Sequence, residues 1–209
     1  MIGLATNVTL DPASPGYKWV DRGEVIESTT TDDFNTIDPN ILDDGENGVW
    51  LTFGSFWTGI KQRRLDPATG LLSFSDTTLY SLARRPPAQS PHDSIEAPVM
   101  VHHGKYYYLF VSFDTCCRGA NSTYRIMVGR SASVNGPFVD MSGVSMMDGG
   151  GTELLHGNGQ WAGPGGQSIW LDSELGDLIV YHAYAVSDGS PWLHLNSLQW
   201  KNDWPVIAP

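Results

Sequence analysis

Apolar and polar positions along the chain follow short runs and do not recur with helical spacing. Runs rich in aromatic and β-branched residues are bounded by Gly, Pro, Asp and Asn, and they recur at residues 48–53, 105–113, 125–129 and 177–184. Such runs are typical of β-strands joined by tight turns. The pattern therefore predicts an all-β protein.

Three segments repeat one unit, in which an apolar strand, a polar turn with Gly and a more aromatic strand follow one another. These segments are residues 41–53, 99–113 and 169–184. A supersecondary unit repeated at wide, irregular spacing indicates the blades of a β-propeller. No linker or change in composition divides the chain, so we expect a single domain over residues 1–209.

A second similarity within the chain concerns its beginning. Residues 2–7, followed by residues 19–23, parallel residues 126–131, followed by residues 138–143. Both copies have the pattern of the outer part of a blade, but only Met1 precedes the earlier copy. We therefore expect the chain to begin inside a blade and to form three fuller blades, one partial blade and no closed ring. Such a propeller has an open sheet edge.

Composition and charge narrow the possible partners. With 41% hydrophobic and 11% aromatic residues, the chain can build a sizeable core. Its net charge of -11 is expected to repel nucleic acid and anionic membrane surfaces. No apolar run reaches the roughly 18 residues that span a bilayer, and the first residues lack the pattern of a signal peptide. A neutral or cationic partner is favoured, and the eight Trp and eight Tyr suit stacking on sugars.

Two carboxylates lie at the heads of successive blade units. Asp38 directly precedes Pro39, and Glu96 is followed by Ala97 and Pro98. Because a residue before proline is held extended, the side chain of Asp38 can be aimed at a ligand, but the Asp-Pro motif alone favours a simple turn. Because the innermost strands of a propeller line its channel, the two carboxylates can face one ligand, which is the pairing that glycoside hydrolysis requires. Apolar neighbours are expected to raise the pKa of Glu96, as suits a general acid.

The aromatic run at residues 53–60 places Phe56 and Trp57 between glycines. Their rings either lie open for stacking on a sugar or pack into the core. The two cysteines, Cys116 and Cys117, are adjacent, and both a pair of reduced thiols and a disulfide between neighbours remain open.

Other familiar kinds of site are not supported. The Gly-rich run at residues 163–168 lacks the lysine of a phosphate-binding loop, so we discard a nucleotide site. The six histidines are not spaced as zinc ligands.

Taken in order, the motifs resemble those of endo-1,5-α-L-arabinanases of glycoside hydrolase family 43. The resemblance covers essentially the whole chain, and the Phe-Gly-Ser-Phe-Trp and Cys-Cys-Arg-Gly elements point to arabinanases more than to the family's xylosidases. The motifs that carry it lie at residues 35–39, 53–60, 95–98, 116–124, 129–131 and 163–167. The resemblance implies a five-bladed β-propeller and an inverting mechanism that uses three acidic residues.

Matched motif by motif, the resemblance assigns roles to residues of this chain. It implies that Glu96 is the general acid and that Asp38 orients and tunes it. It further implies that the substrate contacts Asn35, Phe56, Trp57 and Cys116. The family's general base lies in a His-Asp-Pro motif near its N-terminus, and this chain has no counterpart of that motif. We therefore expect the first blade and part of the second to be missing.

Two functions follow as hypotheses. The first is inverting hydrolysis of α-1,5-arabinan in pectin side chains, impaired because the general base is absent. The second is a non-catalytic arabinan-binding propeller fragment or inactive homologue. An unrelated lectin-like β-domain is a third possibility, which the ordered motifs disfavour. The expected partners are arabinan and arabino-oligosaccharides, and the parent protein is expected to be secreted.

The resemblance also bears on metals. Many bacterial relatives place a His after Gly-Pro-Gly to line a calcium-containing channel, whereas here Gly166 and Gln167 follow. Only water and carbonyl ligands would then be left to hold a structural calcium. We expect no cofactor.

Overall fold

The computed structural model describes residues 1–86 and 94–208, which form four antiparallel sheets. A two-stranded sheet contains β1 (Ile2–Thr6) and β2 (Val20–Ile26). The next contains β3 (Asn40–Asp43), β4 (Val49–Phe53), β5 (Ile60–Leu65) and β6 (Tyr80–Ala83). The third contains β7 (Ile95–His103), β8 (Tyr106–Phe113), β9 (Arg125–Ser131) and β10 (Thr152–Leu155). The last contains β11 (Trp161–Trp170), β12 (Leu178–Ala185), β13 (Pro191–Lys201) and β14 (Trp204–Ile207).

The helical segments that the structure describes are three single 3-10 turns. They are η1 (Gly45–Asn47), η2 (Gly119–Asn121) and η3 (Met146–Asp148). Within residues 1–86 and 94–208, no helix is long and apolar enough to cross a membrane.

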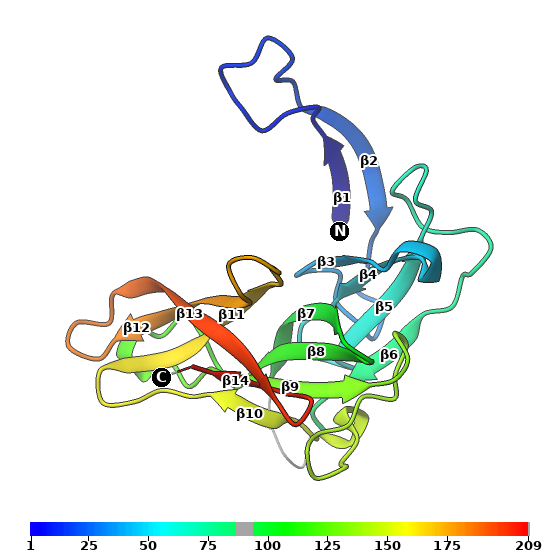
Figure 1. Cartoon of the computed structure of the whole chain (residues 1–209). Coiled ribbons are helices and arrows are strands. Elements are labelled where there is room, and N and C mark those ends of the chain that lie inside the picture. The colour runs from blue at the N-terminus through cyan, green and yellow to red at the C-terminus, as the bar shows by residue number, and fades with distance from the viewer. Residues whose placement is uncertain (87–93, 209) are drawn as a thin grey trace.

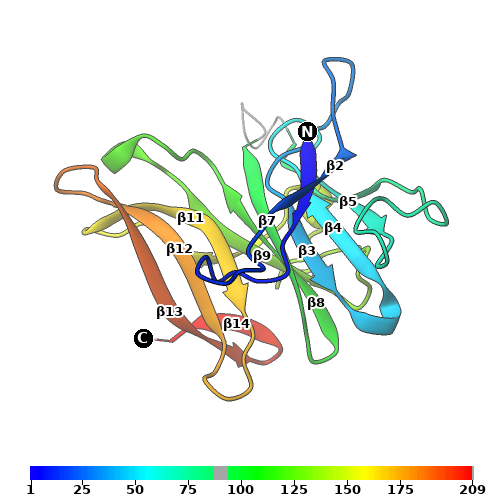
Figure 2. The ribbon, with the colours of Figure 1, turned by 90° about the horizontal axis from the view of Figure 1, so that it is seen from above.

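The three four-stranded sheets stand side by side as blades, with β3, β7 and β11 as their first strands (Figures 1 and 2). From here on they are called the first, second and third blade, in chain order. Each blade adds its strands in chain order, so consecutive strands are neighbours. The blades form an arc and no closed ring, as the sequence predicts (Figure 2). The repeated segments 41–53 and 99–113 each contain most of the first two strands of one blade, whereas segment 169–184 contains most of β12 but only the end of β11.

Alternation along β8 explains how the blades pack. Tyr107 and Leu109 point into the core between the first and second blades, while Tyr108 and Phe110 point into the core between the second and third. All four side chains are buried. Because successive side chains of a strand point to opposite faces, a strand buried on both faces is apolar throughout. The middle blade therefore contributes to the cores on both sides of it.

The β1–β2 hairpin projects away from the three blades (Figure 1). Its base is anchored on the first blade, where Ile2 and Ile26 pack with Leu51 and Phe53. Residues farther along it, including Val8 and Trp19, are exposed. The hairpin is the partial blade that the sequence predicts, and its parallel with residues 125–143 holds only in part.

The difference lies at the second segment of each copy. Residues 20–26 form a full strand against β1, whereas Val139 makes only isolated bridges to Arg130 and Ser145. The reason is that β10 already pairs with β9 at Ile126, Met127 and Val128. The later segment can therefore reach only the end of β9.

Candidate active site

Asp38 and Glu96 are linked across the inner strands of the first two blades. Asp38 directly precedes Pro39 and β3, and its Oδ2 accepts a hydrogen bond of 3.0 Å from the backbone N–H of Ala97, the residue after Glu96. Two residues farther along, Asn40 Oδ1 accepts one of 2.8 Å from the N–H of Met100. The polar side chains at the start of β3 therefore fix the part of β7 that carries Glu96.

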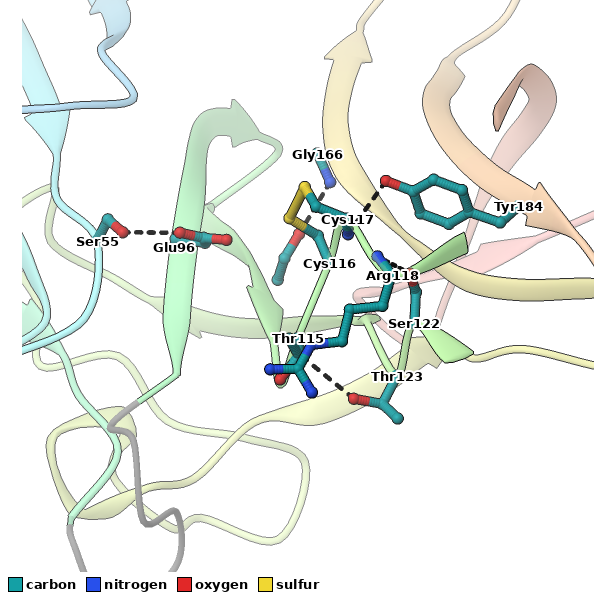
Figure 3. The surroundings of a disulfide bond; sticks show 11 residues. Ser55, Glu96, Thr115, Cys116, Cys117, Arg118, Ser122, Thr123, Gly166 and Tyr184 are labelled. Atoms are coloured by element: carbon teal, nitrogen blue, oxygen red, sulfur yellow. Dashed lines mark hydrogen bonds between the residues drawn. A yellow bond between two sulfur atoms is a disulfide. The ribbon is translucent and has the colours of Figure 1, made fainter. Parts of the chain in front are cut away.

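Glu96 lies half-buried at the start of β7. Ser55 donates a hydrogen bond of 2.7 Å from Oγ to Glu96 Oε2 (Figure 3). Burial raises the pKa of Glu96, the hydrogen bond from Ser55 opposes the rise, and the negative charge of Asp38 adds to it. A carboxyl group with a raised pKa retains its proton to higher pH and can act as a general acid. The direction agrees with the sequence-based prediction.

Left-handed backbone conformations cluster around this pair. The extended backbone expected of Asp38 before Pro39 is wrong, because Asp38 has φ 57°. Ala97 has φ 51°, and Phe56 and Trp57 have φ 57° and 53°. Such values are uncommon for residues other than glycine and occur preferentially at functional sites. The turn that contains Phe56 is attached to the same strand, because the N–H of Phe56 donates to the carbonyl of Ile95 at 2.8 Å. The aromatic run is thereby joined to the strand of Glu96.

The four residues expected to contact the substrate are less closely joined to the carboxylates. Trp57 is 51% exposed, so its ring is not part of the core. Phe56 and Asn35 are half-buried, and Asn35 lies in the loop before β3. Cys116 is half-buried on the loop after β8. Contact between these side chains and a sugar stays a prediction.

Cys116 and Cys117 form a disulfide bond, which answers the question that the sequence left open (Figure 3). Cys117 has a left-handed backbone, and its N–H donates to the hydroxyl oxygen of Tyr184 on β12 at 3.2 Å. On the same loop, the N–H of Arg118 donates to Ser122 Oγ at 3.0 Å. The loop that carries the disulfide is therefore attached to the third blade.

The Gly-rich run at residues 163–168 lies on β11 and permits close packing between blades. A Cβ at Gly165 would stand 2.3 Å from Tyr124 and 2.9 Å from Ser112 Oγ, and one at Gly163 would stand 2.5 Å from Ser122. With contacts this short, a side chain at either position would force its neighbours to shift. The two glycines therefore allow β11 to pack closely against the second blade.

A recess opens where the inner strands of the three blades meet. Its lining includes Asp38, Pro39, Asn40, Ala97, Pro98, Val99, Gly166, Gln167 and Ser168. The polar groups of Asp38 and Gln167 thus lie at the same recess as Ala97, beside the candidate acid.

The residues near this recess do not fit a calcium ion bound through side chains. Calcium takes six to eight oxygen ligands, yet among the described residues no group of three or more His, Cys, Asp or Glu side chains is placed to hold a metal ion. His182 packs against Gly166, and its Nε2 is buried with no hydrogen-bond partner. Burial lowers the pKa of this imidazole. One neutral nitrogen does not supply a calcium site, and we derive no step through a metal.

A model of the family "Glycosyl hydrolases family 43" matches residues 4–205. The chain belongs to glycosyl hydrolase family 43. It is 46% identical over 205 residues to extracellular endo-alpha-(1->5)-L-arabinanase 1 of Bacillus subtilis, covering 98% of this chain and 59% of the relative. It is 41% identical over 215 residues to an extracellular exo-alpha-(1->5)-L-arabinofuranosidase of Cellvibrio japonicus, covering 99% and 61%.

Solved structures agree with the family 43 assignment. The structure of an alpha-L-arabinanase of Cellvibrio cellulosa complexed with arabinohexaose matches with a TM-score of 0.90 and 39% identity, covering 99% of this chain and 68% of that one. The chain thus spans about 60% of the length of the curated relatives. An incomplete family 43 propeller is consistent with this coverage and with the arc of three blades.

Sequence reasoning assigned no role to three residues of the candidate site. Ser55 was visible only as part of the Phe-Gly-Ser-Phe-Trp motif, and its hydroxyl is what contacts Glu96. Ser112 gave no signal, and Gln167 was visible only as part of the Gly-rich motif, because their hydrogen-bond partners lie 54 or more residues away along the chain. Contacts of this range become visible only when the blades are placed side by side.

Proposed function

We propose that this chain carries the general acid of an inverting arabinanase site, whose substrate is α-1,5-linked arabinan. The observation that supports the proposal most strongly is the pair of Glu96 and Asp38 on neighbouring inner strands, with the pKa of Glu96 raised. The names of relatives with endo and exo action on α-1,5-linked arabinose support the substrate class.

In this proposal Glu96 donates its proton to the oxygen of the departing sugar. Asp38 holds the N–H of Ala97, and its charge keeps the proton on Glu96 at higher pH. Trp57 and Phe56 stack on arabinose units, while Asn35 and Cys116 contact the same oligosaccharide. Stacking suits the exposed ring of Trp57.

Inversion also requires a base about 6.5 to 9.5 Å from the acid, with room for the attacking water. Asp11 and Asp21 are exposed on the β1–β2 hairpin, where each accepts a hydrogen bond from a backbone N–H two residues away. That hairpin stands away from β7 (Figure 1). We therefore propose that this chain by itself hydrolyses arabinan only weakly.

The source of the substrate follows from the same proposal. Relatives named extracellular support a secreted parent protein that acts on pectin side chains. A neutral polysaccharide is compatible with a net charge of -11, because it has no charge to be repelled.

Hydrolysis of linear arabinan by the purified chain, with and without azide, tests the proposal. Azide needs no base: it attacks the anomeric carbon, the glycosidic C–O bond breaks, and the leaving oxygen takes the proton of Glu96. We expect weak hydrolysis in water, release of an arabinosyl azide of inverted configuration, and loss of that product in Glu96→Gln. Binding of arabino-oligosaccharides without cleavage in azide would instead favour the non-catalytic arabinan-binding function.

A further inference from the structure

The residue that follows Glu96 has an unusual backbone. Ala97 has φ 51°, a conformation that an alanine rarely adopts, because its Cβ then crowds the carbonyl oxygen. The pairing between β7 and β8 also shifts register between Glu96 and Val99. The strand therefore bulges immediately after the candidate acid, and a bulge re-aims the neighbouring side chain.

Both polar backbone groups of Ala97 are bound by side chains from other blades. Its N–H donates to Asp38 Oδ2 at 3.0 Å, and its carbonyl accepts from Gln167 Nε2 at 2.7 Å. Asp38 lies just before β3 of the first blade, and Gln167 lies on β11 of the third. The left-handed peptide is thus held from two opposite sides.

Gln167 is itself fixed in one orientation. It is 4% exposed, and its Oε1 accepts a hydrogen bond of 2.9 Å from Ser112 Oγ. Ser112 Oγ in turn accepts one of 3.0 Å from the N–H of Gly166. Because the amide nitrogen must face the carbonyl of Ala97, the oxygen faces the hydroxyl of Ser112. Ser112 also pairs directly with Glu96 across β7 and β8.

We propose that Gln167 is a positioning residue for Glu96, which it serves by holding the left-handed peptide of Ala97 through the chain Ser112–Gln167–Ala97. The proposal rests on the proposed role of Glu96 as the general acid. Without the donor on Gln167, the carbonyl of Ala97 is left unpaired and the bulge can relax. Glu96 then loses its fixed direction and becomes more accessible to water.

The test is a titration of Glu96 by NMR in the full chain, with glutamate labelled at the side-chain carboxyl carbon. The chain has six glutamates, and Glu96→Gln assigns the resonance of interest. Gln167→Met preserves the length of the side chain and removes its donor. We expect the pKa of Glu96 to fall toward its ordinary value in this variant, because burial contributes most to the rise and a relaxed bulge exposes the carboxyl to water.

Ser112→Ala is a milder second variant, since it removes the anchor of Gln167 and leaves the bond to Ala97 possible. A smaller shift in the same direction is expected. Gln160→Met, on an exposed loop, is the matched control and should leave the titration of Glu96 unchanged.

An unchanged pKa of Glu96 in a folded Gln167→Met protein, with only a lower melting temperature, would assign Gln167 a purely structural role and overturn the proposal. If that variant does not fold, an unchanged pKa in Ser112→Ala overturns it. The titration needs no sugar, so its outcome is independent of whether the chain cleaves arabinan.

Discussion

Replacing Glu96 with Gln should make the chain more stable at neutral pH and less active. The carboxyl of Glu96 is half-buried, and burial raises its pKa in the folded state above that in the unfolded state. Its contribution to stability is therefore fully present below the pKa of the unfolded state and is lost as pH rises through the folded pKa. Glutamine does not ionise, so the variant avoids this loss of stability, and its side-chain oxygen can still accept the hydrogen bond from Ser55.

The magnitude is modest. A half-exposed carboxylate keeps much of its hydration, so we expect a gain of only about 0.5 kcal/mol. Loss of a general acid typically lowers the rate by about 10²- to 10⁴-fold, which the azide reaction can detect.

Urea unfolding of both proteins between about pH 4, near the ordinary glutamate pKa, and about pH 7 measures this difference. The free energy of unfolding of the variant, relative to that of the wild-type chain, should increase as pH rises. Glu174→Gln, on an exposed loop, shows how the loss of one negative charge acts by itself. If the difference in unfolding free energy between the two proteins does not depend on pH, or if it shifts in favour of the wild-type chain as pH rises, the burial of Glu96 is refuted.

The remaining predictions concern the neighbours of this acid. Asp38→Asn should lower the pKa of the candidate acid, since it removes the negative charge that helps to raise it, and carboxyl NMR measures the shift. Trp57→Ala should weaken binding of arabino-oligosaccharides by about 1 kcal/mol in calorimetry, whereas Phe74→Ala, which removes a ring that is 96% exposed, should not. Gly165→Ala should destabilise the fold by about 1 to 3 kcal/mol through overpacking, whereas Gly159→Ala, where a Cβ meets nothing within 4 Å, should change the melting temperature little.

The sequence predicted strand positions well where a strand is buried on both faces. The apolar run at residues 105–113 predicts a strand, and β8 occupies Tyr106–Phe113 with Tyr108 and Leu109 in different cores. Similar runs predict β4 and β12. These strands can be predicted because the local pattern of apolar residues agrees with their burial.

The contacts around the candidate acid, Glu96, could not be predicted from the sequence. The bond between Ser55 and Glu96 joins residues 41 positions apart, and that between Gln167 and Ala97 joins residues 70 apart. The left-handed backbone of Ala97 has no sequence signal, because alanine does not favour it. The state of the adjacent cysteines also depends on backbone geometry that composition does not give.

We expect an arabinan chain to lie across Asp38 and Glu96 when it binds. Adding arabinohexaose to the ¹⁵N-labelled chain and recording amide chemical shifts tests it directly. We predict saturable changes at Ala97, whose N–H binds Asp38, together with changes at Glu96 and Trp57. Saturable changes confined to the far ends of the blades, or no saturable change at all, would contradict the claim.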